Sequence, residues 1–433
     1  MSTPSSDARS GPVPVFMGAL AVCLAVGAAG CAVAVGAVRY APKATAARLG
    51  QTCTRTVGPH ADLEGALRHA RGHAVLCLRA GSYAAGGQIY LSHITPTATV
   101  TLRPTPGATV KLGWLELAAD VRNLTVEGFV LTRGAADVGP AANVTFRANT
   151  VSGADGATSG FYFYGDGGLQ RNMHVLGNRM SYLAPADLAP PGAGQCVTVS
   201  GGGSEERDFD ISHNVCGPGI GDHYVQVGGI DGLTEDYNEF LGPAAPEALQ
   251  DQAHNNVLQI FGDSENVEFS HNVIRGSESR GQEILIEEGR FVHVNIDDNL
   301  FVGAPRCLRY WNCYSYALGM CATDGLWFQH NTVIGYHWGV QVTHSGGSPG
   351  CLASGRDYQV THNIVVGTND NADITYGECE QRCVFDYNVT SDRSARQGGA
   401  RHYVIDWRPR WRNRTTFGPL GLPFQAGSPA DTG

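Results

Sequence analysis

Three glutamines each lie at the centre of an apolar triplet, a pattern that can present polar groups on one surface. The triplets are Val225-Gln226-Val227, Leu258-Gln259-Ile260 and Val340-Gln341-Val342, with Ile284-Leu285-Ile286 in the equivalent place between the last two. In a strand, successive side chains face opposite sides, so the flanking residues enter a core and the middle residue faces outward. We therefore expect Gln226, Gln259 and Gln341 to share one outward column.

Other groups capable of acid–base chemistry gather around these triplets. A histidine precedes each glutamine by three to five positions, namely His223, His254 and His337. Nearby charged residues are Asp222, Asp251, Asp263, Arg280, Glu283, Glu287, Glu288 and Arg290. The region 222–290 is therefore predicted to form a polar groove in which a linear polymer can meet side chains from successive strands.

The residue types suggest three roles in this groove. Proton transfer needs His, a carboxylate or Arg, so the catalytic candidates are His254 and Glu283 first, then His223 and Arg280. The candidates for substrate contact are Gln226, Gln259, Gln341, His337 and Arg290. Asp263, Glu287 and Glu288 are candidates for metal or substrate contact, with Ca²⁺ as the possible cation. The alternative is that the glutamines recur only because the repeat unit was duplicated, without a role in binding. The glutamates would then form a solvent-exposed salt-bridge cluster that contributes little to stability.

A short sequence motif also recurs along most of the chain, and it indicates which secondary structure positions these residues. It reads apolar-x-apolar, two residues, then Asn, and its copies end at Asn149, Asn178, Asn214, Asn238, Asn272, Asn299, Asn331, Asn363 and Asn388. The successive spacings are 29, 36, 24, 34, 27, 32, 32 and 25 residues. Alternation with period two indicates strands rather than the helices of an α-solenoid.

Each copy fits one rung of a parallel β-helix. Alternate side chains then fill a long core, and loops of variable length leave one corner. Asn tolerates the left-handed conformation that a sharp corner needs, and stacked amides can hydrogen-bond along the axis as a ladder. The 57 glycines, dispersed over 433 residues, also suit many tight turns.

This pattern, with Ser212-His213-Asn214, Ser270-His271-Asn272 and Thr361-His362-Asn363, resembles the right-handed parallel β-helix repeat family with a pectate-lyase-like (pectin lyase-like) fold. The resemblance covers about residues 53–390 and implies an all-β solenoid that holds a carbohydrate along its strands. The Asp and Arg motifs of pectate lyases and the Asn-Thr-Asp and Arg-Ile-Lys signatures of polygalacturonases are absent, so the resemblance extends to the fold and not to the catalytic residues. A short helix within 62–71 is expected to cap the first rung.

The ends of the chain depart from the repeat. No charged residue occurs from Val13 to Val38, a run of 26 positions that is long enough to cross a bilayer. We expect residues 1–12 to form a short tail, 13–38 a membrane anchor or, alternatively, a cleaved signal segment, and 39–52 a linker. Residues 391–433, rich in Arg and Trp, are expected to form a C-terminal cap and tail that can also contact an anionic polymer.

Twelve cysteines occur, of which ten lie in the region after the apolar run. An even set without CxxC pairs favours disulfides over zinc, and disulfides indicate an oxidising compartment. The expected pairs are Cys53 with Cys77, Cys196 with Cys216, and Cys379 with Cys383, while Cys307, Cys313, Cys321 and Cys351 pair among themselves. This argument outweighs the positive charges after the span, which favour a cytoplasmic C-terminal side.

Together these patterns predict an extracytoplasmic carbohydrate-active β-helix, secreted or held at the cell membrane. The first hypothesis is a polysaccharide lyase or glycoside hydrolase that acts on an acidic glycan, and the alternative is a non-catalytic surface β-helix that binds glycan or cell-wall material. A formal net charge of −10 argues against a nucleic-acid partner.

Overall fold

A computed structural model describes the middle of the chain. The described residues are 52–390 apart from 138, 154–158, 166–167, 184–193, 201–205, 221–222, 243–255, 278–281, 304–315, 337–338, 343–354, 367–373 and 377–378. The expected anchor at 13–38 and the expected cap at 391–433 lie outside these residues. Within the described part, no helix has the length and apolar character needed to cross a membrane.

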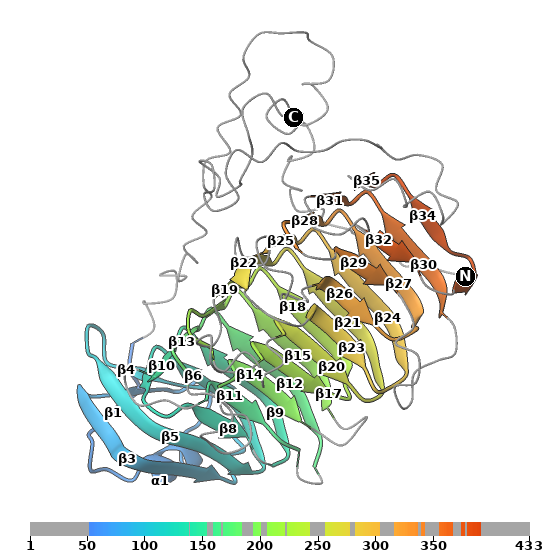
Figure 1. Cartoon of the computed structure of the whole chain (residues 1–433). Helices are drawn as coiled ribbons and strands as arrows, with labels where there is room; N and C mark the ends of the chain where they lie inside the picture. Colours follow the sequence, from blue (N-terminus) through green and yellow to red (C-terminus); the bar gives the residue numbers. More distant parts are fainter. Residues whose placement is uncertain are drawn as a thin grey trace, which may run out of the picture.

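One long parallel sheet, here called sheet A, runs the length of the structure (Figure 1). Every strand pairs in parallel with the strand of the next turn of the chain. Its fourteen strands are β1 (Arg55–Val57), β2 (Val75–Leu78), β4 (Val100–Pro104), β6 (Val121–Glu127), β9 (Ala141–Arg147), β12 (Gln170–Leu176), β15 (Glu206–Ser212), β18 (Asp231–Asp236), β21 (Ser264–Ser270), β24 (Phe291–Asp297), β27 (Asp324–Gln329), β30 (Gly355–Thr361), β33 (Cys379–Gln381) and β34 (Val384–Asp386).

The second sheet has two arms, which are joined at one end because β3 (Gly81–Ser92) and β5 (Val110–Ala119) run through both. The first arm, arm B1, contains β7 (Val130–Leu131), β10 (Thr150–Ser152), β13 (Arg179–Ser181), β16 (Val215–Cys216), β19 (Glu239–Leu241), β22 (Val273–Ser277), β25 (Leu300–Gly303), β28 (Thr332–Ile334), β31 (Ile364–Val366) and β35 (Val389–Thr390). The second arm, arm B2, contains β8 (Ala135–Asp137), β11 (Phe161–Phe163), β14 (Val197–Ser200), β17 (Val225–Gly228), β20 (Leu258–Phe261), β23 (Gln282–Glu287), β26 (Tyr316–Met320), β29 (Val340–Val342) and β32 (Ile374–Tyr376).

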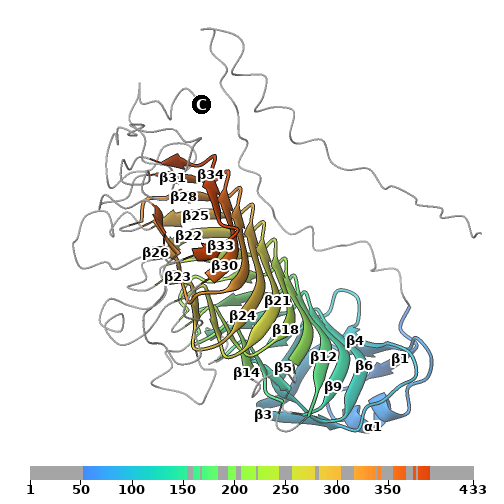
Figure 2. The same ribbon diagram turned by 90° about the vertical axis from the view of Figure 1, so that its right-hand side faces the viewer.

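The chain visits the three surfaces in a fixed order, so each turn is one rung. For example, β18 of sheet A leads to β19 of arm B1, then to β20 of arm B2, and β21 begins the next rung beside β18. Figure 2 shows the rungs stacked one behind another. The expected parallel β-helix is thereby confirmed.

The core is a column of apolar side chains from all three surfaces. Inward side chains of the same type stack on one another in successive rungs. The buried rings of Phe240, Phe269 and Phe301 do so, with centroids 6.3 and 6.4 Å apart. Full burial of one such ring stabilises the fold by roughly 2–3 kcal/mol. Since each rung covers the next, the strand pairing and the apolar core support each other along the whole axis.

The nine expected asparagines form one continuous ladder at the corner between sheet A and arm B1. All nine are at most 2% exposed: Asn149, Asn178, Asn214, Asn238, Asn272, Asn299, Asn331, Asn363 and Asn388. The Oδ1 atom of Asn272 accepts from the backbone N–H of Asn238 at 2.8 Å and from its Nδ2 at 3.1 Å. Nδ2 of Asn272 donates to Asn299 Oδ1 at 3.2 Å and to the Glu235 carbonyl at 2.8 Å. The same four contacts recur from rung to rung, so the structure confirms the ladder.

A short helix, α1 (Leu63–Arg68), covers the first rung as expected, although it is shorter than the 62–71 range. Asp62 begins the helix because its carboxylate accepts from the Gly65 N–H at 2.8 Å. Leu63, Ala66 and Leu67 are buried against the core. The helix therefore shields the apolar end of the solenoid, while β1 pairs with β2 at the edge of sheet A.

Three of the expected disulfides are confirmed. Cys53–Cys77, Cys196–Cys216 and Cys379–Cys383 have Cα separations of 5.6, 6.2 and 6.2 Å. Cys321 is disulfide-bonded as well. Cys307, Cys313 and Cys351 lie outside the described residues.

One inward position breaks the apolar pattern. Glu235 of β18 is paired in register with Ile211 on one side and Phe269 on the other, and its side chain is fully buried. Among the described residues, neither carboxyl oxygen has a hydrogen-bond partner. Burial therefore raises the pKa of Glu235 well above its ordinary value of 4.5, and the group is held as a neutral acid.

Removing one amide of the ladder should be costly. Asn272→Ala leaves buried groups of Asn238, Asn299 and Glu235 without their partner, so we expect a loss of on the order of 3 kcal/mol in the free energy of unfolding. Chemical denaturation of the full-length protein measures this loss. Asn295→Ala, on the half-exposed outer face of β24, is the matched control and should change stability by less than about 0.5 kcal/mol. Equal effects of the two substitutions would contradict a buried ladder.

The buried carboxyl of Glu235 should make stability fall with rising pH. Its folded pKa lies above the unfolded value, so its favourable contribution is complete below about pH 4.5 and is lost as pH rises toward the folded pKa. Between the unfolded and the folded pKa of Glu235, the free energy of unfolding should fall by about 1.4 kcal/mol per pH unit. Glu235→Leu should remove this slope and stabilise the protein by about 2 kcal/mol at neutral pH. Denaturation curves from pH 4 to 8 test this, with exposed Glu265→Gln as the control; an unchanged slope in Glu235→Leu would contradict the neutral acid.

Candidate functional site

The three glutamines singled out from the sequence lie in one column on the outer face of arm B2. The register places Gln226 opposite Gln259, Gln259 opposite Leu285, and Gln341 opposite Gly319 of β26. All three side chains are half-buried, and their apolar neighbours enter the core. Leu285 and Gly319 therefore separate Gln341 from the other two.

Side-chain amides in this region form an outer hydrogen-bonded ladder over four rungs. Gln195 Nε2 donates to Gln226 Oε1 at 3.0 Å, and Gln226 Nε2 donates to Gln259 Oε1 at 2.7 Å. Gln259 Nε2 then donates to the carboxylate of Glu287 at 2.8 Å. We call this surface, made by Gln195, Gln226, Gln259 and Glu287, the ladder face. All donors point the same way along the axis, and the last acceptor is charged, which strengthens the chain of bonds.

The two central amides keep capacity for a ligand. A glutamine amide carries two N–H donors and two lone pairs on its oxygen. In the ladder, Gln226 and Gln259 each use one donor and one lone pair. Each can therefore offer a second donor and a second lone pair at the partly exposed surface, with the regular rung spacing of about 4.8 Å.

Aromatic rings flank the ladder face. One rung before Thr198, Tyr162 of β11 and Tyr164, directly after that strand, stack with centroids 6.1 Å apart and planes 6° apart. Tyr164 is 40% exposed, and burial together with the neighbouring Tyr164 raises the pKa of Tyr162. Beside Gln259, the half-buried Phe261 ring covers Gly228 of the preceding rung so closely that a Cβ there would lie 2.6 Å from the ring. The face thus combines flat apolar rings with regularly spaced amides.

The described charges on this surface are mainly carboxylates. Glu287 ends the ladder, and Glu116, which lies earlier in the same column, accepts from Trp114 Nε1 at 3.2 Å. Arg290 is exposed at the corner that follows β23, and its charge helps to lower the pKa of Asp324 on sheet A, after the larger effect of the hydrogen bond from Arg356.

Of the four predicted catalytic residues, the structure describes His223 and Glu283, and both are buried. His223 is 5% exposed, and its Nδ1 lies 3.4 Å from the backbone N of Asn256. Glu283 is fully buried, and its charge adds to burial in raising the pKa of the enclosed Tyr224. His254 and Arg280, together with the substrate candidate His337, lie outside the described residues. A role for these five residues in catalysis or substrate contact stays a prediction.

The structure does not bring the predicted metal ligands together. Asp263 accepts from the backbone N–H of Arg290 at 2.9 Å, Glu287 ends the outer ladder, and Glu288 occupies an exposed turn with φ 57°. In the described part of the chain, the group of ligating side chains close enough to share a cation is Asp297, Asp298 and His330, on a different surface.

The sequence candidates did not include Gln195 of the ladder face or the flanking rings of Tyr162 and Phe261. Gln195 lies two residues before β14 and not at a strand centre, so alternation gives no signal for it. Tyr162 occupies the centre of the triplet Phe161-Tyr162-Phe163, the same pattern as the glutamine triplets, and that pattern predicts its outward direction. Phe261 follows the Gln259 triplet by one position and would have been found from the same alternation.

No protein-family model matches the chain, and no curated protein matches it. Among solved structures, the chain is similar to the crystal structure of PfbA, a surface adhesin of Streptococcus pneumoniae. The two share 10% sequence identity over 76% of this chain and 88% of that chain, with a TM-score of 0.39. A likeness at this level adds nothing to a functional argument. The β-helix assignment rests on the strand pairing itself.

Proposed function

We propose that this protein is a non-catalytic surface β-helix that binds a linear polysaccharide along the ladder face. The observation that carries the proposal is the outer ladder itself, in which Gln226 and Gln259 hold partly exposed amides in register on neighbouring rungs. A polymer lying along the solenoid axis meets an equivalent donor and acceptor at these two neighbouring rungs. This repetition matches a ligand that is itself a repeat.

The flanking rings support a sugar ligand in particular. A pyranose has an apolar face of C–H groups and a rim of hydroxyls, so it packs on aromatic rings and hydrogen-bonds to amides at once. The stacked Tyr162 and Tyr164 provide such a platform one rung before the ladder, and Phe261 provides another beside Gln259. Tight, preorganised amides also lose little side-chain freedom on binding.

The charges favour a neutral glycan over the acidic glycan expected from the sequence. Glu287 and Glu116 would repel a polyuronate. Amides, in contrast, pair well with hydroxyl or acetamido groups. A neutral polymer is therefore the ligand class we assign to this face.

Cleavage of the polymer has less support than binding. His223 and Glu283, the two described residues proposed for acid–base work, are both buried. Glu287 is more exposed, but its carboxylate accepts the hydrogen bond from Gln259 that ends the outer ladder. Membership in the pectate-lyase-like family stays a prediction from the sequence.

We place the folded part outside the cytoplasm, anchored or released through residues 13–38. The described disulfides support this location because the cytosol keeps thiols reduced. The division into an anchor, a linker, a β-helix at 53–390 and a C-terminal cap is part of the same proposal.

Disruption of the outer ladder should weaken glycan binding. The full-length protein is tested on a panel of linear neutral polysaccharides and polyuronates by affinity electrophoresis and calorimetry. Gln259→Ala removes the central amide and frees Glu287 from its partner, so we expect at least a tenfold loss of affinity for the neutral polymer that wild type binds.

Gln359→Ala is the matched control, since this exposed glutamine lies on sheet A. It should bind as wild type does. Equal binding by Gln259→Ala, or retention on polyuronates alone, would overturn the proposal. Release of reducing ends or unsaturated sugars from the bound polymer would show an enzyme in place of a binding protein.

An extracytoplasmic location predicts that few cysteines are free thiols. In denatured protein purified from its native cell, we expect at most two reactive thiols, because ten of the twelve cysteines pair and only Cys23 and Cys31 are left. Titration with a thiol reagent before and after reduction counts them. Ten reactive thiols before reduction would contradict both the pairing and the extracytoplasmic location.

A further inference from the structure

A ridge of rings runs along the corner between sheet A and arm B1, away from the ladder face on arm B2. It consists of the residue that precedes each of the last seven ladder asparagines, in a left-handed conformation with φ between 53° and 60°: His213, Tyr237, His271, Asp298, His330, His362 and Tyr387. Neighbouring rings stack, as His213 on Tyr237 at 5.1 Å and Tyr237 on His271 at 4.6 Å. His330, His362 and Tyr387 form a second stack at 5.3 and 5.1 Å.

Asp298 interrupts the ridge between its two stacks, and there carboxylates meet imidazoles. The ligand atoms of Asp297, Asp298 and His330 all lie within 4.8 Å of one another. His330 Nδ1 lies 2.9 Å from Asp297 Oδ1, across two neighbouring rungs. Asp297 is half-buried and the other two are exposed, so the cluster is open to ions from solution.

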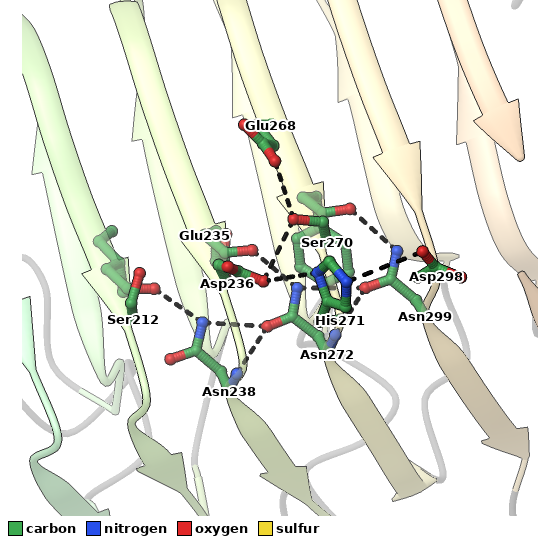
Figure 3. A network of polar contacts seen from close by, with 12 residues as sticks. Ser212, Glu235, Asp236, Asn238, Glu268, Ser270, His271, Asn272, Asp298 and Asn299 are labelled. Carbon is green, nitrogen blue, oxygen red and sulfur yellow. Dashed lines mark hydrogen bonds and ion pairs between the residues drawn. The ribbon is translucent and has the colours of Figure 1, made fainter. Parts of the chain in front are cut away.

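A second imidazole faces Asp298, the other carboxylate of the cluster. His271 places Nδ1 3.1 Å from Asp236 and Nε2 3.7 Å from Asp298 (Figure 3). A separation of 3.7 Å is too long for a hydrogen bond. Metal-ligating histidines typically hydrogen-bond to a carboxylate through one ring nitrogen and point the other ring nitrogen toward the metal position. His271 has this orientation.

We propose that Asp297, Asp298 and His330 bind a divalent transition-metal ion of the Zn²⁺ class, with His271 as a neighbouring donor. Imidazole with two carboxylates suits Zn²⁺, Co²⁺ or Ni²⁺, whereas Ca²⁺ and Mg²⁺ prefer oxygen ligands alone. Three protein ligands leave a further position for water or for a ligand group from outside. The ladder asparagines Asn299 and Asn331 fix the backbone directly after Asp298 and His330, so the site is held by the buried core of the solenoid.

Calorimetry of the full-length protein with ZnCl₂ tests the site. His330→Asn and Asp298→Asn keep side chains that tolerate the left-handed conformation while they remove a strong ligand. Each should weaken Zn²⁺ binding by about 100-fold or abolish one equivalent. His213→Asn is the matched control, because it has the same ridge position and φ but lies outside the cluster, and it should bind as wild type does.

Wild-type protein also gives a test that requires no variant. Paramagnetic Co²⁺ added to full-length protein should broaden or shift the ring signals of His330 and His271 before those of His213. Unchanged Zn²⁺ affinity in both His330→Asn and Asp298→Asn, or an equal loss in His213→Asn, would overturn the proposal. So would Co²⁺ effects spread evenly over the surface histidines.

Discussion

The interaction on which the rest of the structure depends is the buried asparagine ladder. Each carboxamide accepts from the rung on one side and donates to the rung on the other, and it also satisfies a carbonyl inside the corner. A buried amide without these partners would be costly, so a shift of one rung relative to the next breaks several bonds together. The ladder therefore fixes register as well as stability.

Fixed register explains why functional groups repeat on the outside. Because the asparagines stack, the residue before each of them stacks too, which builds the ring ridge with its His and Asp cluster. On arm B2 the same register aligns Gln226 with Gln259, so their amides meet as an outer ladder. The inner amides are buried and serve the fold, while the outer amides of Gln226 and Gln259 are partly exposed and have bonding capacity left for a ligand.

Much of this could be predicted from the sequence because it follows from short-range periodicity. The recurrent motif gave all nine ladder asparagines, and strict alternation gave the outward direction of Gln226, Gln259 and Gln341. What alternation could not give lies where strands end: Gln195 joins the outer ladder from a corner, and Glu283 and His223 are enclosed near the start of their strands. Glu235 was not recognised, although the motif that ends at Asn238 places it at the second apolar, inward position. The metal cluster was missed because its members come from adjacent rungs and share no sequence motif, although a ring or Asp before each late asparagine was a visible signal.

Side-chain amide NMR of full-length protein labelled with ¹⁵N at Asn and Gln tests the central claim most directly, that one register holds both an inner and an outer amide ladder. The account predicts that the nine ladder asparagines exchange their side-chain protons slowly and do not respond to the bound neutral glycan. Gln226 and Gln259 should exchange faster and shift on glycan addition, whereas Gln359 should not shift. Ladder asparagines that exchange as fast as Gln359, or a glycan that shifts Gln359 and leaves Gln226 and Gln259 unchanged, would contradict it.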